Sequence, residues 1–433
     1  MARLTWPGPA ARGRDSPAAL RSAVRKVLLN VIAPLALAYF LMLMDRVAIG
    51  FAAPAIGAAL TMTPPQVGLA APVLFLGILL FAVPSAVLAN RFGARRWLAV
   101  LLCLSGLAAV GTAFAAGSAT FFAARMVAAI AQAALLPTAL FLSARWVPAA
   151  FRTRLTAWVV LTALAGVAVG QPLHAGLAML DGVAGLAGWR WFFLAAGLPC
   201  LPLAWWVLRR VPDVPREAPW LTEDEGAALA WSRSVEPRET REDTAFSALL
   251  DPRLLLLAGI NAGLALSAAA AGTWYALLMQ DQRAPLLPIG LLFLGVTTIT
   301  VLLWPHRIDR TGRVLEGLTI AAALATVAYA AGVLRGPTIT MLVGLAAHAA
   351  TIEAARTMMW SVAGRLSVAG RGGVATLAVI DATGQVAAFV APRLITGAAE
   401  KAGNLQFGLV TLTLIPLAVC VLAGVLRLIS PRN

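Results

Sequence analysis

Apolar and polar residues follow one another along this chain in long blocks. Twelve apolar runs, each near the roughly 20 residues that a helix needs to cross a bilayer, alternate with polar connections. The pattern predicts an all-α polytopic membrane protein with 12 transmembrane helices in two six-helix bundles. The runs lie at about 27–51, 66–89, 97–117, 119–144, 155–178, 189–208, 254–279, 285–305, 314–334, 337–360, 373–397 and 405–428.

Two polar segments divide the chain. Residues 1–26 are basic and rich in Pro and Gly, so we expect a disordered cytoplasmic tail. Residues 211–252 form a cytoplasmic linker between an N-terminal bundle (27–210) and a C-terminal bundle (253–429). Thr222 followed by Glu225 is a capping pattern that favours one short surface helix in the linker, and a flexible linker is the alternative.

The charged residues support this membrane topology. Only 12% of the residues are charged, against about 25% in soluble proteins, and the net charge is +15. The arginines concentrate in every second connection, as on the cytoplasmic side of membrane proteins, so both chain ends are expected there. This placement favours the lipid bilayer, and no nucleic acid, as partner. The excess of Arg and Ala over Lys is typical of a GC-rich bacterial genome, which indicates a bacterial cytoplasmic (inner) membrane.

Asp45 and Arg46 lie side by side within the first apolar run. Each ion costs roughly 3 kcal/mol or more deep in lipid. The economical interpretation is that this helix lines a polar cavity within the bundle. Alternatively, the two charges neutralise each other and reach toward the headgroups.

A short motif recurs in the two halves. NRFGARR after the second run and DRTGR after the eighth run share a polar residue, Arg and Gly at the same spacing. The glycines permit tight turns, and the arginines are expected to cap helices and pair with acids, which would close the cytoplasmic side. The gate motif comprises Asn90, Arg91, Gly93, Arg95, Asp309, Arg310, Gly312 and Arg313.

At this point the sequence resembles the major facilitator superfamily. LMLMDRVAIGFAAPAIG, FAVPSAVLANRFGARRW and GVAGLAGWRWFFLAAGLPC are similar to signatures of its anion:cation symporter family, and the similarity is specific over about 35–225. The resemblance implies alternating access and import of a small organic anion with protons or another coupling cation. Export of a drug or metabolite, an uncoupled facilitator and a sensor remain alternatives.

The resemblance also implies that Arg46 and Arg125 bind the substrate carboxylate. Measured from the predicted ends of their runs, both lie some 8–9 Å inside the outer boundary, at roughly 1.5 Å per residue. Two guanidiniums at one level would form a fork for a carboxylate, although Arg125 could instead reach out from a helix start. Tyr39, Gln132, Gln385 and Tyr275 complete the expected site. Tyr275 could equally belong to an interfacial aromatic belt.

The sequence departs from the family pattern in helix four. The family has an acid where this chain has Gln132, which cannot carry a proton, and several other polar positions are apolar here. We therefore favour an aromatic or partly apolar monocarboxylate. The proton-coupling candidates are Asp45 and Asp381, with Asp381 replacing the lost acid or else neutralised by an arginine. Glu353 and Arg356, three residues apart, predict a gate or a structural ion pair near the cytoplasmic end.

Other function classes lack their motifs. We find no nucleophile–base pair, no metal-ligand spacing and no Walker A pattern, so no enzymatic activity, metal or cofactor is expected. The three cysteines fall in apolar runs, where packing roles are expected. The chain is expected to act as a monomer.

Overall fold

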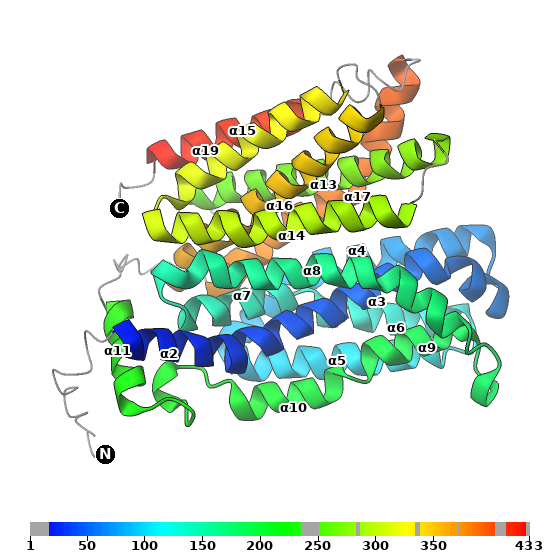
Figure 1. Ribbon diagram of the computed structural model, residues 1–433. Helices are drawn as coiled ribbons and strands as arrows, with labels where there is room; N and C mark the ends of the chain where they lie inside the picture. Colours follow the sequence, from blue (N-terminus) through cyan, green and yellow to red (C-terminus); the bar gives the residue numbers. More distant parts are fainter. Residues whose placement is uncertain are drawn as a thin grey trace.

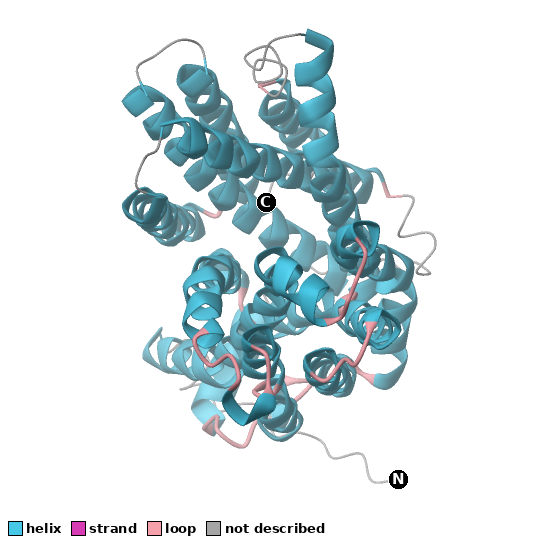
Figure 2. Ribbon diagram, turned by 90° about the vertical axis from the view of Figure 1, so that its right-hand side faces the viewer, coloured by secondary structure: helices cyan, strands magenta, loops and turns pink. Residues whose placement is uncertain are grey.

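The computed structural model describes residues 17–234, 251–282, 286–333, 338–369, 373–402 and 413–429. Helices account for nearly all of these residues, and none of them forms a strand (Figure 2). Nine helical stretches among them are long and apolar enough to cross a membrane, and α19 is a shorter apolar helix. The described part of the chain is therefore the helical membrane protein that the blocks of apolar residues predict.

The helices form two bundles that lie one above the other in Figure 1. The first bundle contains η1 (Leu28–Ile32), α3 (Ala33–Ala59), α4 (Pro64–Phe92), α5 (Ala94–Ala113), α6 (Ser118–Gln132), α7 (Leu135–Trp146), α8 (Ala149–Ala178), α9 (Gly188–Gly197) and α10 (Cys200–Arg210). The second contains α13 (Pro252–Gln282), α14 (Leu286–Thr311), α15 (Val314–Val333), α16 (Thr338–Ala369), α17 (Gly373–Ala402) and α19 (Leu414–Ile429). The bundles meet where α8 packs on α14 and α16, α4 on α17, and α7 on α16 and α17.

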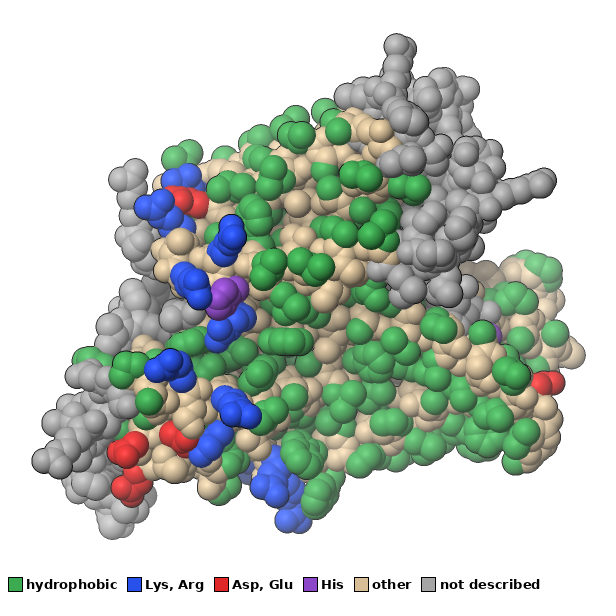
Figure 3. Space-filling model, in the orientation of Figure 1, with side chains coloured by type: hydrophobic (Ala, Val, Ile, Leu, Met, Phe, Trp, Pro, Cys, Tyr) green, Lys and Arg blue, Asp and Glu red, His purple; other side chains and the backbone are tan. Residues whose placement is uncertain are grey.

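Basic side chains mark one end of the molecule. On the face shown in Figure 3, Lys and Arg side chains gather at the left-hand end, where Figure 1 places α2, α11 and the last turn of α19. We call this the basic end. Away from that end, the described side chains on this face are largely hydrophobic, as a surface in contact with lipid tails requires.

Two predicted single spans are each divided into two helices. The fourth run breaks after Gln132, at Ala133 and Ala134, and continues as α7. Pro137 explains the break, because its ring clashes with the carbonyl four residues earlier and it has no N–H to donate. The sixth run breaks at Leu198 and Pro199, because Pro199 likewise has no N–H to donate. The first break matters for function, because it places Gln132 at the end of α6.

The first membrane helix is longer than predicted. α3 continues past Phe51, through Pro54, to Ala59. Arg46 therefore lies about 20 Å from the end of the helix at roughly 1.5 Å per residue, whereas the predicted 8–9 Å is measured from the end of the apolar run at Phe51. The apolar pattern does not locate the helix end, because the small residues that follow Phe51 mark a boundary only weakly.

The expected disordered tail is also shorter than predicted. Pro17–Val27 form helix α2, which leads through η1 into α3. Within α2, Ser22 and Lys26 contact Glu225 of the linker helix α11 (Glu223–Ser234) at 2.6 and 2.7 Å. Glu225 also completes the predicted capping box, since its carboxylate accepts from the Thr222 N–H and its own N–H donates to the Thr222 hydroxyl. The short linker helix is thus confirmed, and an unpredicted helix packs against it.

Candidate functional site

Arg46 lies where the two bundles meet. Its side chain extends from α3, is half-buried, and donates from Nε to Gln132 Oε1 at 3.0 Å. Its Nη1 donates to Gln385 Oε1 of α17 at 3.3 Å. One guanidinium therefore contacts an amide from each bundle, which is the position expected of a group that binds solute between moving halves.

Asp45 is paired with Arg125 and not with its neighbour Arg46. Arg125 Nη1 donates to both carboxylate oxygens, at 2.9 and 3.0 Å, and Gln132 Nε2 donates to Oδ2 at 2.7 Å. Arg125 is 0% exposed and Asp45 only 3%. The Arg125 guanidinium also lies 5.6 Å from the ring centre of Phe193. The alternative interpretation, a self-neutralising Asp45–Arg46 pair, is therefore wrong.

The expected fork of two guanidiniums is not formed in this conformation. Arg46 faces the second bundle, whereas Arg125 faces the interior of the first and uses its Nη1 to neutralise Asp45. The Nε and Nη2 atoms of Arg125 have no hydrogen-bond partner among the described residues. Arg46 alone therefore presents its positive charge between the halves.

In the second bundle, Asp381 is linked to Arg46 through Gln385. It lies in α17, is 6% exposed, and accepts from Gln385 Nε2 at 3.4 Å. Arg46 and Arg356 are the cations whose field reaches it. No ion pair with Asp381 is formed within the described part of the chain, so its charge is less fully neutralised than that of Asp45.

Glu353 and Arg356 form the predicted ion pair, with 3.2 Å between Oε1 and Nη1. Arg356 also donates to the Leu264 carbonyl of α13 at 3.4 Å. The charges of the pair act on Tyr39 of α3, as do those of Arg46 and Asp381, so the pair lies within electrostatic reach of the central site. Tyr275 belongs to α13, but its side chain lies outside those that the structure describes.

The gate motif joins the bundles through its first residue in each half. Asn90 Oδ1 accepts from the N–H of Val374 at the start of α17, at 3.3 Å. Asp309 accepts from the N–H groups of Thr153 and Arg154 near the start of α8, at 3.2 and 2.8 Å. These contacts hold α4 to α17 and α14 to α8. We call them the basic-end latch.

The motif glycines make the predicted turns, since Gly93 and Gly312 adopt φ of +89° and +70°. The motif arginines remain within their own halves or meet the linker. Arg95 pairs with Asp213 at 3.4 Å and Arg313 with Glu316 at 3.5 Å, while Arg91 lies over the Phe92 ring and Arg310 is exposed. Two of the expected pairs between motif arginines and acids are therefore formed, whereas the described bonds between the bundles come from Asn90 and Asp309.

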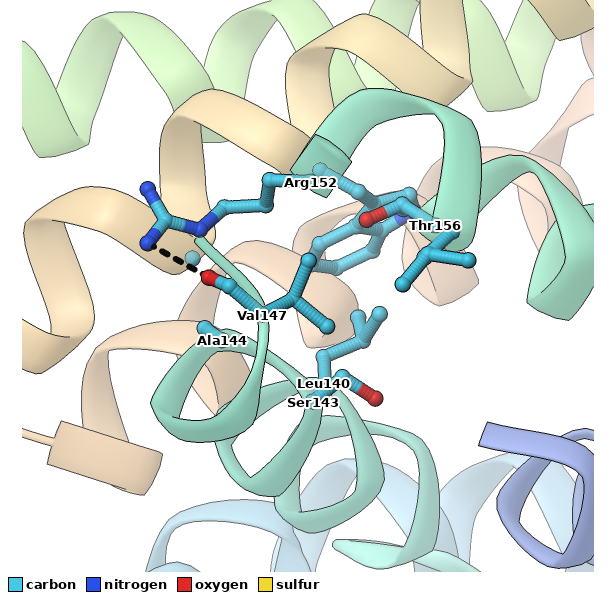
Figure 4. A pocket seen from close by; sticks show the side chains of 9 residues that line it. Leu140, Ser143, Ala144, Val147, Arg152 and Thr156 are labelled. Atoms are coloured by element: carbon cyan, nitrogen blue, oxygen red, sulfur yellow. Dashed lines mark hydrogen bonds between the residues drawn. The ribbon is translucent and has the colours of Figure 1, made fainter. Parts of the chain in front are cut away.

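A small pocket lies beside the latch, between α7, α8 and α16 (Figure 4). Arg152 donates to the Val147 carbonyl across it at 3.0 Å, and Leu140, Thr156 and Trp360 form part of its wall. Next to it, Thr153 and Ser361 join their hydroxyls at 3.0 Å. None of the predicted substrate-binding residues lines this pocket, so it belongs to the closed basic end.

The sequence did not identify every residue of the latch. Thr153, Arg154 and Ser361 complete it, yet the arginines of this connection were interpreted only as topological charges. A hydroxyl beside a basic residue is common in membrane proteins, so no sequence signal singled these positions out.

Two helical bundles that pack around buried charges define a polytopic membrane transporter, and the comparisons with known proteins agree. The family model described as Major Facilitator Superfamily matches residues 35–392. This chain belongs to that superfamily.

Several relatives cover nearly the whole chain. A protein of Agrobacterium vitis named for tartrate transport is 28% identical, over 95% of this chain and 96% of its own. A protein of Acinetobacter baumannii named a quinolone resistance transporter is 30% identical, over 92% of this chain and 93% of its own. Among solved structures, the human organic anion transporter MFSD10 aligns with a TM-score of 0.65 at 15% identity, over 94% of this chain and 100% of its own. FucP, solved in an outward conformation, aligns with a TM-score of 0.67 at 14% identity, over 93% and 99%. These structures establish the shared fold.

Proposed function

We propose that this protein moves a small organic carboxylate across the bacterial inner membrane by alternating access, together with a proton. The observation that carries the proposal is the position of Arg46, which donates to one amide of each bundle. A carboxylate that binds its guanidinium would touch both halves, so binding and the relative movement of the halves would be linked. The basic end is assigned to the cytoplasm, and the transport unit is one chain.

A carboxylate fits the names of the relatives. Tartrate is a dicarboxylic acid, and quinolones carry an aromatic carboxylic acid. Around Arg46 the described neighbours include Tyr39 and Met42, and Arg46 forms no ion pair within the described part of the chain. We therefore favour an aromatic or partly apolar monocarboxylate over a polyhydroxy acid. The quinolone resistance relative favours export of such a compound as the second candidate.

The charges around the site favour proton coupling. Arg46, Arg125 and Arg356 balance Asp45, Asp381 and Glu353. A bound monoanion would leave one negative charge uncompensated, and a buried charge without a partner is expensive. One proton removes that excess. Asp381 is assigned as its acceptor, because Asp45 and Glu353 are each held by an arginine.

Uptake into proteoliposomes tests this function. Purified protein would be reconstituted and offered radiolabelled 4-hydroxybenzoate, D-gluconate or L-tartrate with the outside acidic, with protein-free liposomes correcting for passive entry. We expect accumulation of one of the carboxylates above its equilibrium distribution. Arg46→Gln should abolish transport, and Asp381→Asn should abolish accumulation driven by the pH gradient. Asp224→Asn, on the exposed linker helix, is the matched control. Unchanged accumulation by Asp381→Asn would rule out the assigned proton acceptor.

A further inference from the structure

Arg46 lies between two amide–acid pairs, Gln132–Asp45 and Gln385–Asp381, which we call its two arms. On one side, the Gln132 amide accepts from Arg46 through its oxygen and donates to Asp45 through its nitrogen, at 3.0 and 2.7 Å. On the other side, the Gln385 amide accepts from Arg46 and donates to Asp381, at 3.3 and 3.4 Å. Each bundle thus contributes one acid and one amide, and the guanidinium is shared.

The direction of each amide depends on the charges beside it. A glutamine side chain offers an acceptor at its oxygen and donors at its nitrogen. A guanidinium only donates, so it must face the amide oxygen. The amide nitrogen then faces the acid, and this orientation favours an ionised carboxylate because such a carboxylate only accepts. Each intervening amide is therefore oriented as an ionised carboxylate requires.

The two arms differ in what else holds the acid. Asp45 receives two further bonds from Arg125, so its charge stays compensated whatever Gln132 does. Asp381 has no such partner among the described residues, where it accepts its hydrogen bond from Gln385. Only the Gln385 arm can therefore change the protonation state of its acid.

We propose that the Gln385 amide couples anion binding to protonation of Asp381 by reversing its direction. When a substrate carboxylate takes the Nη1 donor of Arg46, Gln385 Oε1 loses its partner. The amide then rotates and presents Oε1 to Asp381, which can satisfy that acceptor only by carrying a proton. The proton comes from bulk water and binds one carboxylate oxygen, so the site gains one anion and one proton with no net charge. This inference rests on the proposed function and assigns its coupling step to one residue.

The surroundings of Asp381 are consistent with this switch. From α3, Arg46 and Tyr39 lie within electrostatic reach, and from α16, Arg356 reaches it with Glu353 as its ion-pair partner. From α13, the uncharged Asn261 is engaged in donating to the Ile380 carbonyl at 2.6 Å. Helices α4 and α7 also pack on α17, and none of their described side chains is among the charged groups that act on Asp381. The amide of Gln385 is thus the group that connects Arg46 to the acid.

The test compares the same substitution in the two arms. Gln385→Met keeps the length of the side chain and removes both hydrogen bonds, and Gln132→Met does the same in the other arm. The probe is 4-hydroxybenzoate, or L-tartrate if the uptake panel selects it. Two quantities are measured: proton uptake on binding in weakly buffered detergent solution, and counterflow of labelled probe in proteoliposomes without a pH gradient.

We expect wild type to take up about one proton per bound anion and Gln385→Met to take up almost none per bound anion, while a slower counterflow remains. Continued counterflow would also show that the variant is folded. Gln132→Met should bind the probe more weakly but retain the proton ratio, since Asp45 keeps its ion pair with Arg125. A full proton ratio in Gln385→Met would overturn the relay. Loss of binding and counterflow in Gln385→Met would overturn it as well and make Gln385 a substrate ligand. If wild type itself takes up no proton, the proposed coupling fails first, and the relay fails with it.

Discussion

The Asp45–Arg125 pair allows a quantitative test of the site. Arg125→Met would leave the Asp45 carboxylate buried at 3% exposure, with only the Gln132 amide donating to it. Removing one partner of a buried ion pair typically costs about 3–5 kcal/mol, because the remaining charge is uncompensated. Since Gln132 still contributes one charge-assisted bond, we expect the lower end, about 3 kcal/mol. That corresponds to a roughly hundredfold change in the ratio of folded to unfolded protein.

A double-mutant cycle separates the charge effect from the loss of packing. Asp45→Asn combined with Arg125→Met removes both charges, so we expect it to recover about 2 kcal/mol relative to the sum of the single variants. The assay is unfolding by denaturant in detergent micelles, followed by tryptophan fluorescence. Arg96→Met, an exposed position at the basic end, controls for loss of an arginine side chain and should change stability by less than about 0.5 kcal/mol. Additive losses in the double variant would show that the two side chains do not compensate each other.

Three further predictions concern the periphery. Burial would raise the pKa of the Glu225 carboxyl, but its hydrogen bonds from Lys26, Ser22 and Thr222 outweigh burial and lower that pKa to about 2. The packing of α2 on α11 should therefore be fully stabilised above about pH 4.5 and should weaken as the pH falls toward 2. Hydrogen exchange in α2 should show this loss, about 1–2 kcal/mol given the partial exposure of Lys26, and Glu225→Gln should remove the pH dependence. Asp309→Ala deletes the acceptor for two backbone N–H groups of α8. Distances between spin labels on α8 and α14 should then show a roughly tenfold larger population with the basic end open. An unchanged distance distribution would count against the latch. Arg190 donates to the Ala113 and Ala115 carbonyls at the end of α5. Arg190→Gln should therefore speed hydrogen exchange at this end of α5 by an amount that corresponds to about 1–3 kcal/mol. An equal exchange rate in the variant and the wild type would contradict this role.

The apolar pattern predicted the class of fold because membrane helices need long apolar runs. It could not place helix ends, since small residues such as those between Phe51 and Ala59 favour neither side of a boundary strongly. The tail was mispredicted for another reason. A short basic segment has little helical stability alone, and α2 is held by Glu225, about 200 residues later in the chain.

The candidate site was predicted as a set of residues but not as a set of pairs. The sequence singled out Asp45, Arg46, Arg125 and Asp381 because charges within apolar runs are costly and uncommon. It left the partners open, because adjacency along a helix says little about which groups meet across helices. Asp45 and Arg46 point in different directions from α3, roughly 100° apart, so each finds its partner on a different neighbour.

Gln132 shows how one substitution can change the balance of charges in a binding site. An acid at this position, as in the family pattern, would add a negative charge beside Asp45 and Arg46. Glutamine instead leaves Asp45 fully compensated by Arg125 and passes a neutral hydrogen bond to Arg46. With that acid missing, the only incompletely compensated acid near Arg46 among the described residues is Asp381, on the other bundle. Proton binding would then respond to contacts between the halves, because the acid and the guanidinium belong to different bundles. Restoring the acid with Gln132→Glu should therefore add a second protonation to the binding equilibrium, which proton uptake per bound anion would report as an increase above the wild-type ratio.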